Sequence, residues 1–259
     1  MPERALAAVV LAAGKGKRIA HPHLPKALLP LEGRPLIEYV LRAVQQLPVE
    51  RLLVVVGFRG EQVVEYVRRH APSAECVWQD EQLGTGHAVW QTAPLLREFP
   101  GDVLMLPADV PLVQTQSLQQ LLQAHRAHGA VLSVLTTRMP NPVGYGRIVR
   151  DASGALLRIV EESDATEQER SIPEVNTGIL LARAEWLYRL LPQLQRRNAQ
   201  QEYYLTDLVT LCCQHGLPVW AEVAPQWEQF QGVNTVEELE RAAALLRKVS
   251  LGTACAHGT

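Results

Sequence analysis

The sequence has few cysteines and no excess of charge of either sign. Its 259 residues include four cysteines, two of them adjacent at Cys212 and Cys213, and their spacing forms neither a Cys-x-x-Cys pair nor a disulfide framework. Lys and Arg number 25 against 27 Asp and Glu, so the chain lacks the positive surplus on which non-specific nucleic-acid binding depends. We therefore expect reduced thiols, a cytoplasmic location and no nucleic-acid partner.

Long apolar runs and internal repeats are absent as well. No run approaches the ~20 apolar residues that cross a bilayer, so a membrane partner is not expected. The apolar segment 6–13 leads into Gly14-Lys15-Gly16-Lys17-Arg18 without a cleavage site, which favours a buried strand entering a turn over a signal peptide. No hexapeptide period marks a left-handed β-helix. At 47% hydrophobic and 20% charged residues, the composition is that of a globular chain of one or two domains.

Apolar strands and amphipathic helices alternate through the first half of the chain. We expect strands over 6–13, 52–57, 76–78, 103–106 and 131–135, and helices over 35–47, 63–67, 86–96 and 118–127. This order predicts a Rossmann-like, mostly parallel central sheet flanked by helices. In the second half, strands over 145–150 and 156–161 joined at Asp151-Ala152-Ser153-Gly154 predict a hairpin, and with it a smaller antiparallel lobe. We expect the remainder to form a polar loop over 162–173, a strand over 175–182 and helices over 185–191, 205–215 and 235–248.

A glycine-rich turn with three basic residues follows the first expected strand. Gly14 and Gly16 let backbone N–H groups approach a phosphate, and the neighbouring Lys and Arg side chains would neutralise its charge. The dinucleotide-binding fingerprint would need a further glycine at Ile19, and the Walker loop an earlier glycine that 11–13 do not supply. Alone, the turn would equally fit a surface loop with solvated lysines.

A third lysine, Lys26, favours a ligand site over a surface loop. Lys26 stands in the largely apolar stretch 24–31, where burying an ammonium without an anion is costly. Gly14-Lys15-Gly16-x-Arg18 followed by Pro25-Lys26 resembles the start of the sugar-1-phosphate nucleotidyltransferases, which usually have Thr at position 17 and Met at 19. Seven further segments resemble other motifs of that family and follow one another in the family's order. They are 79–88, 107–112, 144–148, 159–162, 175–179, 202–207 and 232–235.

Segment 79–88 is similar to the base-reading segment of the bacterial uridyltransferases that act on N-acetylglucosamine 1-phosphate. The Gln79 amide, a donor and an acceptor, would then pair with the N3–H and a carbonyl of uracil. The nucleotide-binding residues that the resemblance implies are Leu11, Ala12, Ala13, Gly14, Gly16, Gln79, Gly84 and Thr85. Those implied for the sugar are Gly146, Glu161, Asn176, Tyr204 and Thr206.

The resemblance also implies the catalytic groups. Asp109, at the end of a buried strand, and Asn234 would be the protein ligands of Mg²⁺. Lys26 would hold the attacking phosphate, and Arg18, with Lys15 or Lys17, would bind the departing pyrophosphate. His21, His23 and His87 form no ligand set with a cysteine, and we expect them to be non-catalytic.

The reaction implied is magnesium-dependent transfer of a uridylyl group from UTP to N-acetylglucosamine 1-phosphate, which releases pyrophosphate. Ala108 stands where the family usually has glycine, and Pro107-Ala108-Asp109-Val110-Pro111 also resembles molybdenum-cofactor nucleotidyltransferases. Two alternatives therefore stay open: a nucleotidyltransferase for another sugar 1-phosphate or for molybdopterin, and a non-catalytic sensor that binds a nucleotide sugar.

The motifs run through most of the chain. We expect a catalytic domain over 1–234, with a nucleotide-binding part over about 1–140 and a sugar-binding part over about 141–234. A C-terminal helix over 235–249 and a frayed tail over 250–259 would follow. In this branch a hexapeptide-repeat acetyltransferase domain commonly comes next, and we expect none within this chain. The oligomeric state is left open.

Overall fold

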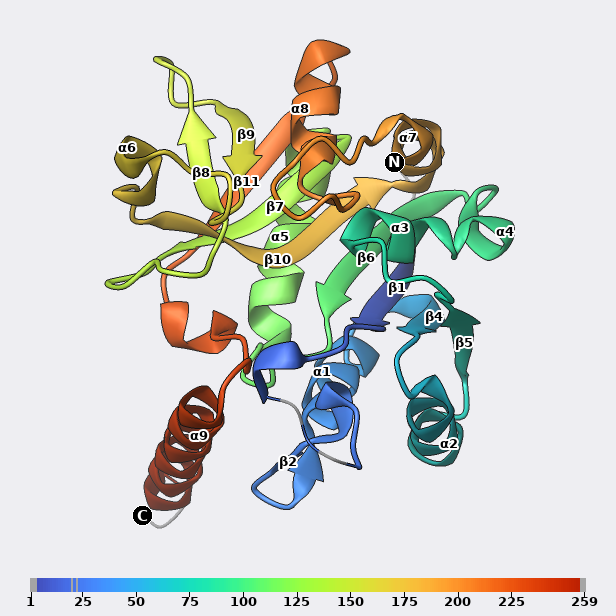
Figure 1. Cartoon of the computed structure of the whole chain (residues 1–259), viewed down its shortest axis with the longest axis vertical. Helices are drawn as coiled ribbons and strands as arrows, with labels where there is room; N and C mark the ends of the chain where they lie inside the picture. Colours follow the sequence, from blue (N-terminus) through green and yellow to red (C-terminus); the bar gives the residue numbers. More distant parts are fainter. Residues whose placement is uncertain (1–3, 20, 22, 257–259) are drawn as a thin grey trace.

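The computed structural model describes residues 4–19, 21 and 23–256, and Figure 1 labels most of the elements they form. The strands are β1 (Ala5–Ala12), β2 (Pro30–Leu31), β3 (Arg34–Pro35), β4 (Val49–Val56), β5 (Ala74–Trp78), β6 (Gly101–Pro107), β7 (Leu132–Arg138), β8 (Arg147–Arg150), β9 (Leu156–Val160), β10 (Glu174–Arg183) and β11 (Val219–Ala224). The α-helices are α1 (Leu36–Gln45), α2 (Gly60–His70), α3 (Thr85–Trp90), α4 (Ala93–Leu96), α5 (Thr115–Ala127), α6 (Glu167–Arg170), α7 (Ala184–Leu190), α8 (Asp207–Gln214) and α9 (Val236–Ala256).

Strand β1 lies inside a sheet whose main path runs β11-β7-β10-β6-β1-β4-β5. It pairs in parallel with both neighbours, so that Ala8 lies opposite Leu52 on β4 and Leu104 on β6. Strand β10 is antiparallel to β6 and β7, and β11 is parallel to β7. The mostly parallel sheet predicted from the sequence is confirmed.

Helices cover both faces of this sheet, as Figure 1 shows. Since successive side chains of a strand point to opposite faces, alternate residues of β1 enter two different cores. Ala8 and Val10 pack in one core with residues of α1, α2 and α5. Ala7 and Val9 pack in the other with residues of α3, α4, α7 and α8. This double burial explains why the strand reads as an unbroken apolar run.

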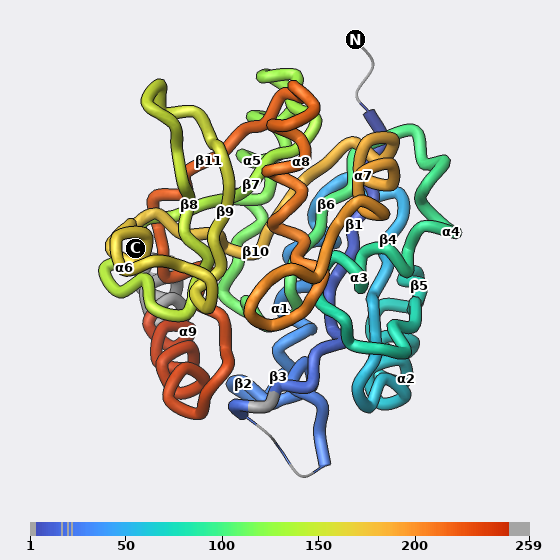
Figure 2. The backbone as a smooth tube through the Cα atoms, turned by 45° about the horizontal axis from the view of Figure 1, so that its top comes forward, coloured from blue at the N-terminus to red at the C-terminus, as the bar shows by residue number. Residues whose placement is uncertain are grey.

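The smaller antiparallel lobe is a hairpin that branches from β10. Strands β8 and β9 pair with each other, and Arg147 of β8 lies opposite Val175 of β10. Figure 2 shows the hairpin and α6 together beside the main sheet. The hairpin expected around Asp151 is therefore confirmed, with the Asp151 carboxylate accepting hydrogen bonds from the backbone of Ser153 and Ala155.

Some elements differ from the sequence prediction. Helix α6 interrupts the expected loop over 162–173, because Thr166 and Glu169 form a capping box that starts a helical turn. The helix expected over 86–96 is two helices, α3 and α4, with Thr92 at the break. Strand β11 was not expected: its side chains are mostly half-exposed, so it lacks the apolar run of the inner strands.

Helix α9 packs on its own chain. Ala242 is buried, and Leu239, Ala243 and Leu246 contact a cluster that includes Leu31. The helix extends to Ala256, past the end expected at 249, while the last three positions of the expected tail, 257–259, lie outside the described residues. Among the described residues, no helix is both long and apolar enough to cross a membrane.

Candidate active site

A cleft of about 910 Å³ opens at the carboxyl ends of β1, β5 and β6. Ligands of open parallel sheets bind at this edge. Its lining comprises Leu11, Ala12, Ala13, Gly14, Lys15, Gly16, Arg18, Lys26, Ala27, Gln79, Gln82, Gly84, Thr85, Ala88, Pro107, Ala108, Asp109, Gly144, Glu162, Ser163, Gln200, Glu202 and Asn234. Every residue expected to bind the nucleotide or the metal, together with Lys26 and Arg18, therefore lies on one cavity.

The loop after β1 packs on Lys26 through a glycine. Gly16 has φ of +59°, and a Cβ there would lie 2.9 Å from the Cβ of Lys26. Both the left-handed backbone and the close approach require glycine. The loop also brings Arg18 and Lys15 to the cleft, while the Lys17 side chain lies outside the described residues.

Lys26 joins the two predicted metal ligands. Its ammonium donates hydrogen bonds to the Asp109 carboxylate and, at 2.6 Å, to Oδ1 of Asn234. The side chains of Lys26 and Asp109 are 15% and 23% exposed, so the ion pair faces the cleft without being fully solvated. The structure thus brings together three residues from distant parts of the chain.

Asn234 is held in place by the start of α9. Its backbone N–H and that of Thr235 donate to the Glu238 carboxylate, at 2.5 and 3.1 Å. The Thr235 hydroxyl in turn accepts from the backbone N–H of Glu238, which confirms the expected cap. One residue earlier, the N–H of Val233 donates to the carbonyl of Asp109, at 2.9 Å. The segments carrying Asp109 and Asn234 are therefore joined through the backbone.

The side chains of Asp109 and Asn234 could also bind a divalent cation. A carboxylate and an amide oxygen that converge on one positive charge are oxygen donors of the kind that Mg²⁺ prefers, and Mg²⁺ keeps its remaining ligands as waters or phosphate oxygens. Within the described chain, no group of three His, Cys, Asp or Glu side chains forms a site that the protein would complete alone. The donor set fits a cation whose shell is completed by a phosphate-bearing ligand.

The segment 79–88 forms another wall of the cleft. Gly84 has φ of +108°, and a Cβ there would lie 2.6 Å from the Tyr203 carbonyl oxygen. The Thr85 hydroxyl accepts from the backbone N–H of Leu205, at 3.0 Å. The Gln79 amide nitrogen donates to the Gly84 carbonyl at 3.0 Å, so this amide is partly engaged within the protein.

Four of the five residues expected to bind the sugar gather behind the hairpin. The Thr206 hydroxyl donates to Glu161 at 2.8 Å, and the Asn176 N–H donates to the Gly146 carbonyl at 2.8 Å. Burial raises the pKa of the Glu161 carboxyl, and the nearby acidic side chain of Asp207 adds to this effect.

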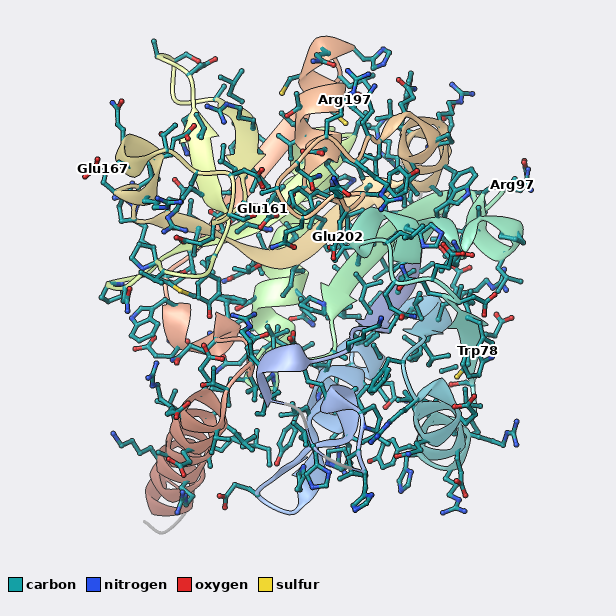
Figure 3. All side chains as sticks on the ribbon, in the orientation of Figure 1. Trp78, Arg97, Glu161, Glu167, Arg197 and Glu202 are labelled. Atoms are coloured by element: carbon teal, nitrogen blue, oxygen red, sulfur yellow. The ribbon has the colours of Figure 1, made fainter. Side chains whose placement is uncertain are left out.

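Tyr204 lies in the same region, where its hydroxyl contacts Asp164 at 3.2 Å. Burial raises its pKa to about 12. None of the five residues expected for the sugar is among those lining the cleft, but Glu162, next to Glu161 in sequence, is. Figure 3 labels Glu161, at the end of the hairpin, and Glu202, on the segment that leads to α8.

Some cleft residues were not expected from the sequence. They are Gln82, Gly144, Glu162, Ser163, Gln200 and Glu202. The Glu162 carboxylate accepts from the Gly144 N–H at 3.0 Å and pairs with Arg147 at 2.8 Å. These cationic and N–H partners lower its pKa, against the opposing effect of burial. Gln82, Gly144, Glu162 and Glu202 lie within the motif segments but had no role assigned to them, whereas Ser163 and Gln200 lie just outside those segments.

A mostly parallel sheet with a glycine loop, cations and an acidic residue at its carboxyl edge is typical of α/β proteins that bind phosphate-bearing ligands. The sequence pattern of the MobA-like NTP transferase domain matches residues 8–174, and the chain belongs to this family. It is therefore a nucleotidyltransferase.

Individual relatives narrow the comparison. The chain is 44% identical over 243 residues to the bifunctional protein GlmU of Pelobacter propionicus, covering 94% of this chain and 52% of that protein. It is 43% identical over 246 residues to GlmU of Geobacter metallireducens, covering 94% and 51%. It is 40% identical over 245 residues to GlmU of Desulfotalea psychrophila, and the match covers 95% of this chain and 71% of that protein. The chain thus spans about half the length of the first two relatives.

A solved structure supports the fold. A crystal structure from Bacillus anthracis, provisionally described as a glucose-1-phosphate thymidylyltransferase in complex with a sucrose, superimposes with a TM-score of 0.76. The match covers 94% of this chain and 96% of that one, at 18% sequence identity. At that identity the likeness concerns the architecture of the chain.

Proposed function

We propose that this chain transfers a uridylyl group from UTP to N-acetylglucosamine 1-phosphate, giving UDP-N-acetylglucosamine and pyrophosphate. The observation that carries the proposal is the convergence of Lys26, Asp109 and Asn234 on a cleft that also contains the Gln79 segment. Support comes from the similarity of nearly the whole chain to the GlmU proteins.

The chemistry needs positioning and charge rather than a base. An oxygen of the sugar 1-phosphate forms a bond to the α-phosphorus of UTP, and the bond from that phosphorus to the bridging oxygen of pyrophosphate breaks. The nucleophile is already an anion, so no proton has to be removed. Two polyanions must instead be held together while charge accumulates between them.

The basic side chains of the cleft meet that demand. Lys26 would hold the attacking phosphate beside the α-phosphate. Arg18 and Lys15, on the loop after β1, would bind the β- and γ-phosphates. Asp109 and Asn234 would hold Mg²⁺, which when bound neutralises phosphate charge and orients the phosphate oxygens.

The lobe would supply sugar selectivity. Thr206 is hydrogen-bonded to Glu161, which is next in sequence to Glu162 of the cleft, and the Asn176 backbone is hydrogen-bonded to that of Gly146. Polar groups of this kind would recognise hydroxyl and N-acetyl groups. A polar site rejects analogues that lack the matching group, because its own donors and acceptors are then left unpaired. We therefore expect N-acetylglucosamine 1-phosphate to be preferred over glucose 1-phosphate.

Pyrophosphate release by the purified chain tests the proposal. The four nucleoside triphosphates are each combined with N-acetylglucosamine 1-phosphate, glucose 1-phosphate or molybdopterin in the presence of Mg²⁺. The proposal predicts the highest kcat/KM for UTP with N-acetylglucosamine 1-phosphate. Turnover confined to another sugar phosphate or to molybdopterin would replace the substrate assignment, and binding of UDP-N-acetylglucosamine without turnover would favour the sensor alternative.

A further inference from the structure

His87 contacts the side chain that is expected to read the base. It lies on α3, and its Nδ1 is 3.0 Å from the amide nitrogen of Gln79. The same nitrogen is 3.0 Å from the Gly84 carbonyl oxygen. Gln79 is only 3% exposed, yet it lines the cleft. The contact is thus made inside the wall of the cleft and not in solvent.

These two contacts fix the direction in which the Gln79 amide points. A carbonyl oxygen can only accept, so the group facing Gly84 is the NH₂ of Gln79. Because the same NH₂ faces His87, Nδ1 must accept the second hydrogen, and the neutral ring carries its proton on Nε2. Both donor hydrogens of the Gln79 amide are therefore used within the protein.

The amide oxygen is left for a ligand. Oε1 of Gln79 forms no hydrogen bond with any described residue, and it is not fully buried. It therefore keeps access to the cleft. With its NH₂ engaged in this way, Gln79 would meet a base as an acceptor alone, and not as the donor and acceptor expected from the sequence.

The His87 ring is itself held from two sides. It stacks on Tyr203 with a centroid distance of 6.2 Å and an interplanar angle of 26°. Its Nε2, which carries the proton, lies 3.1 Å from the Gln91 side-chain amide, one turn further along the chain, and donates to that amide when the amide turns its oxygen toward the ring. Tyr203 is anchored in turn by its N–H, which donates to the Leu83 carbonyl at 2.8 Å. A half-turn of the ring would keep the stacking but place a C–H group opposite the Gln79 amide, so the hydrogen bond to Gln79 favours the present ring orientation.

We propose that His87 is a positioning residue that holds the Gln79 carboxamide with its oxygen toward the cleft, so that the site selects bases with a ring N–H. Uracil at N3 and guanine at N1 present that donor. Cytosine at N3 and adenine at N1 present an acceptor, which would face Oε1 unpaired. The inference rests on the proposed function only in taking the cleft to bind a nucleoside triphosphate.

Removing the Nδ1 acceptor should loosen this selection. One N–H of Gln79 would then lack its partner, and the amide could turn to present NH₂ to the ligand. Cytosine would gain a donor while uracil would lose its acceptor. We expect the ratio of affinities for UTP and CTP to fall about tenfold, the effect of one hydrogen bond.

His87→Phe and His87→Asn form the test pair. Phenylalanine keeps the ring over Tyr203 but has no acceptor, whereas the asparagine side-chain oxygen restores an acceptor near the position of Nδ1. Dissociation constants for UTP, CTP, GTP and ATP are measured by calorimetry, with kcat at saturating UTP and thermal unfolding in parallel. The expected result is a lower UTP-to-CTP ratio in His87→Phe, an unchanged kcat, and recovery of the ratio in His87→Asn.

An unchanged UTP-to-CTP ratio in folded His87→Phe, or equal weakening of all four nucleotides, would overturn the inference while leaving uridylyl transfer intact. If His87→Phe does not fold, the same four dissociation constants are measured for the wild type and for Gln79→Leu. The inference requires UTP or GTP to bind the wild type more tightly than CTP and ATP, and Gln79→Leu to abolish that difference. Preference for GTP would contradict uridylyl transfer but support a Gln79 oxygen that faces the cleft, and preference for CTP or ATP would contradict both.

Discussion

The Lys26 ammonium lies between the Asp109 carboxylate and, at 2.6 Å, the side-chain oxygen of Asn234, although these partners are 83 and 208 positions away in the chain. A lysine in an apolar stretch is stabilised here by two oxygens that face a cleft. A polyanionic ligand would meet this ammonium and the two oxygen donors together, and the following predictions concern that arrangement and the parts that support it.

Asp109→Asn should weaken Mg²⁺ binding and lower turnover without unfolding the chain. The substitution keeps an oxygen but removes the charge, so we expect a higher Mg²⁺ concentration at half-maximal rate and at least a 100-fold loss of turnover. Pyrophosphate release during a Mg²⁺ titration measures both. Asp151→Asn, in the exposed hairpin turn, makes the same chemical change away from the cleft, and an equal loss in that variant would remove the special role of Asp109.

Gly16→Ala should lower both stability and activity. Its φ of +59° disfavours alanine by about 1 kcal/mol, and the new Cβ would lie 2.9 Å from the Cβ of Lys26. Gly154→Ala is the matched control, because φ there is +86° but nothing lies within 4 Å of the new Cβ. Denaturant unfolding should report a loss in both variants, and pyrophosphate release a loss only in Gly16→Ala. Equal activities would contradict the close packing of the loop on Lys26.

Glu161→Gln should stabilise the chain at neutral pH. Burial raises the folded-state pKa of Glu161 above its ordinary value of 4.5, so the folded state binds more protons and loses stability as pH rises through that range. Glutamine avoids the buried charge and keeps an acceptor for Thr206. The gain in melting temperature should be present at pH 8 and vanish below pH 4.5. Glu50→Gln, at an exposed position, should show no such gain, and a gain independent of pH would rule out this cause.

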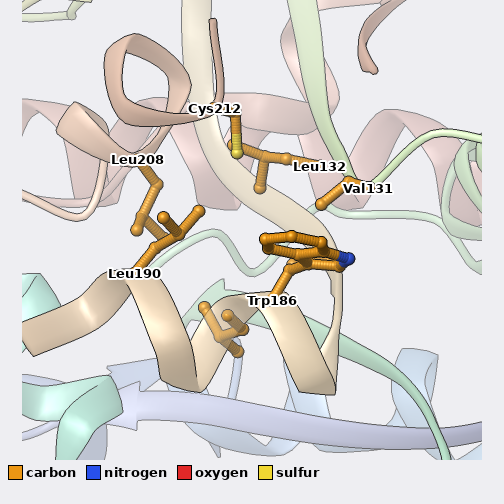
Figure 4. Close-up of a pocket in the computed structure, with 8 residues that line it drawn as sticks. Val131, Leu132, Trp186, Leu190, Leu208 and Cys212 are labelled. Atoms are coloured by element: carbon orange, nitrogen blue, oxygen red, sulfur yellow. The ribbon is translucent and has the colours of Figure 1, made fainter. Parts of the chain in front are cut away.

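Cys212 should resist thiol reagents while its neighbour Cys213 reacts. Cys212 is 2% exposed and borders a small apolar cavity of about 10 Å³ with Trp186 and Leu208, shown in Figure 4. Burial raises its pKa to about 12, so little thiolate is present at pH 8. Cys213 is partly exposed, and mass spectrometry after alkylation compares the two. Equal labelling rates under native conditions would mean that this core opens readily.

Much of the fold could be predicted because its signals are local. The apolar run of β1 and the glycines after it identify a buried strand entering a ligand loop, and the cap at Thr235 identifies the start of α9. Strand β11 could not be predicted in the same way, since it owes its pairing to β7 and not to its own pattern. The capping box at Thr166 was present in the sequence, but the polar character of the segment obscured it.

The residues of the site also differ in how far the sequence could predict them. Residues on the glycine loop and at strand ends could be predicted, because sequence position alone brings them to one edge of the sheet. The hydrogen-bond direction of Gln79 could not, because it depends on where folding places the Gly84 carbonyl and His87. Glu162 was likewise missed, since its cationic partner Arg147 is identified only by the packing of the hairpin.

The most direct test of the central claim is the rate of pyrophosphate release by Lys26→Met with saturating UTP and N-acetylglucosamine 1-phosphate. Methionine keeps the unbranched side chain except for its terminal ammonium group, and Lys248→Met makes the same change on the exposed surface of α9. We predict that turnover falls at least 100-fold in a folded Lys26→Met protein and is unchanged in Lys248→Met. Turnover near the wild-type rate in Lys26→Met would contradict the assignment of this cleft as the site of nucleotidyl transfer.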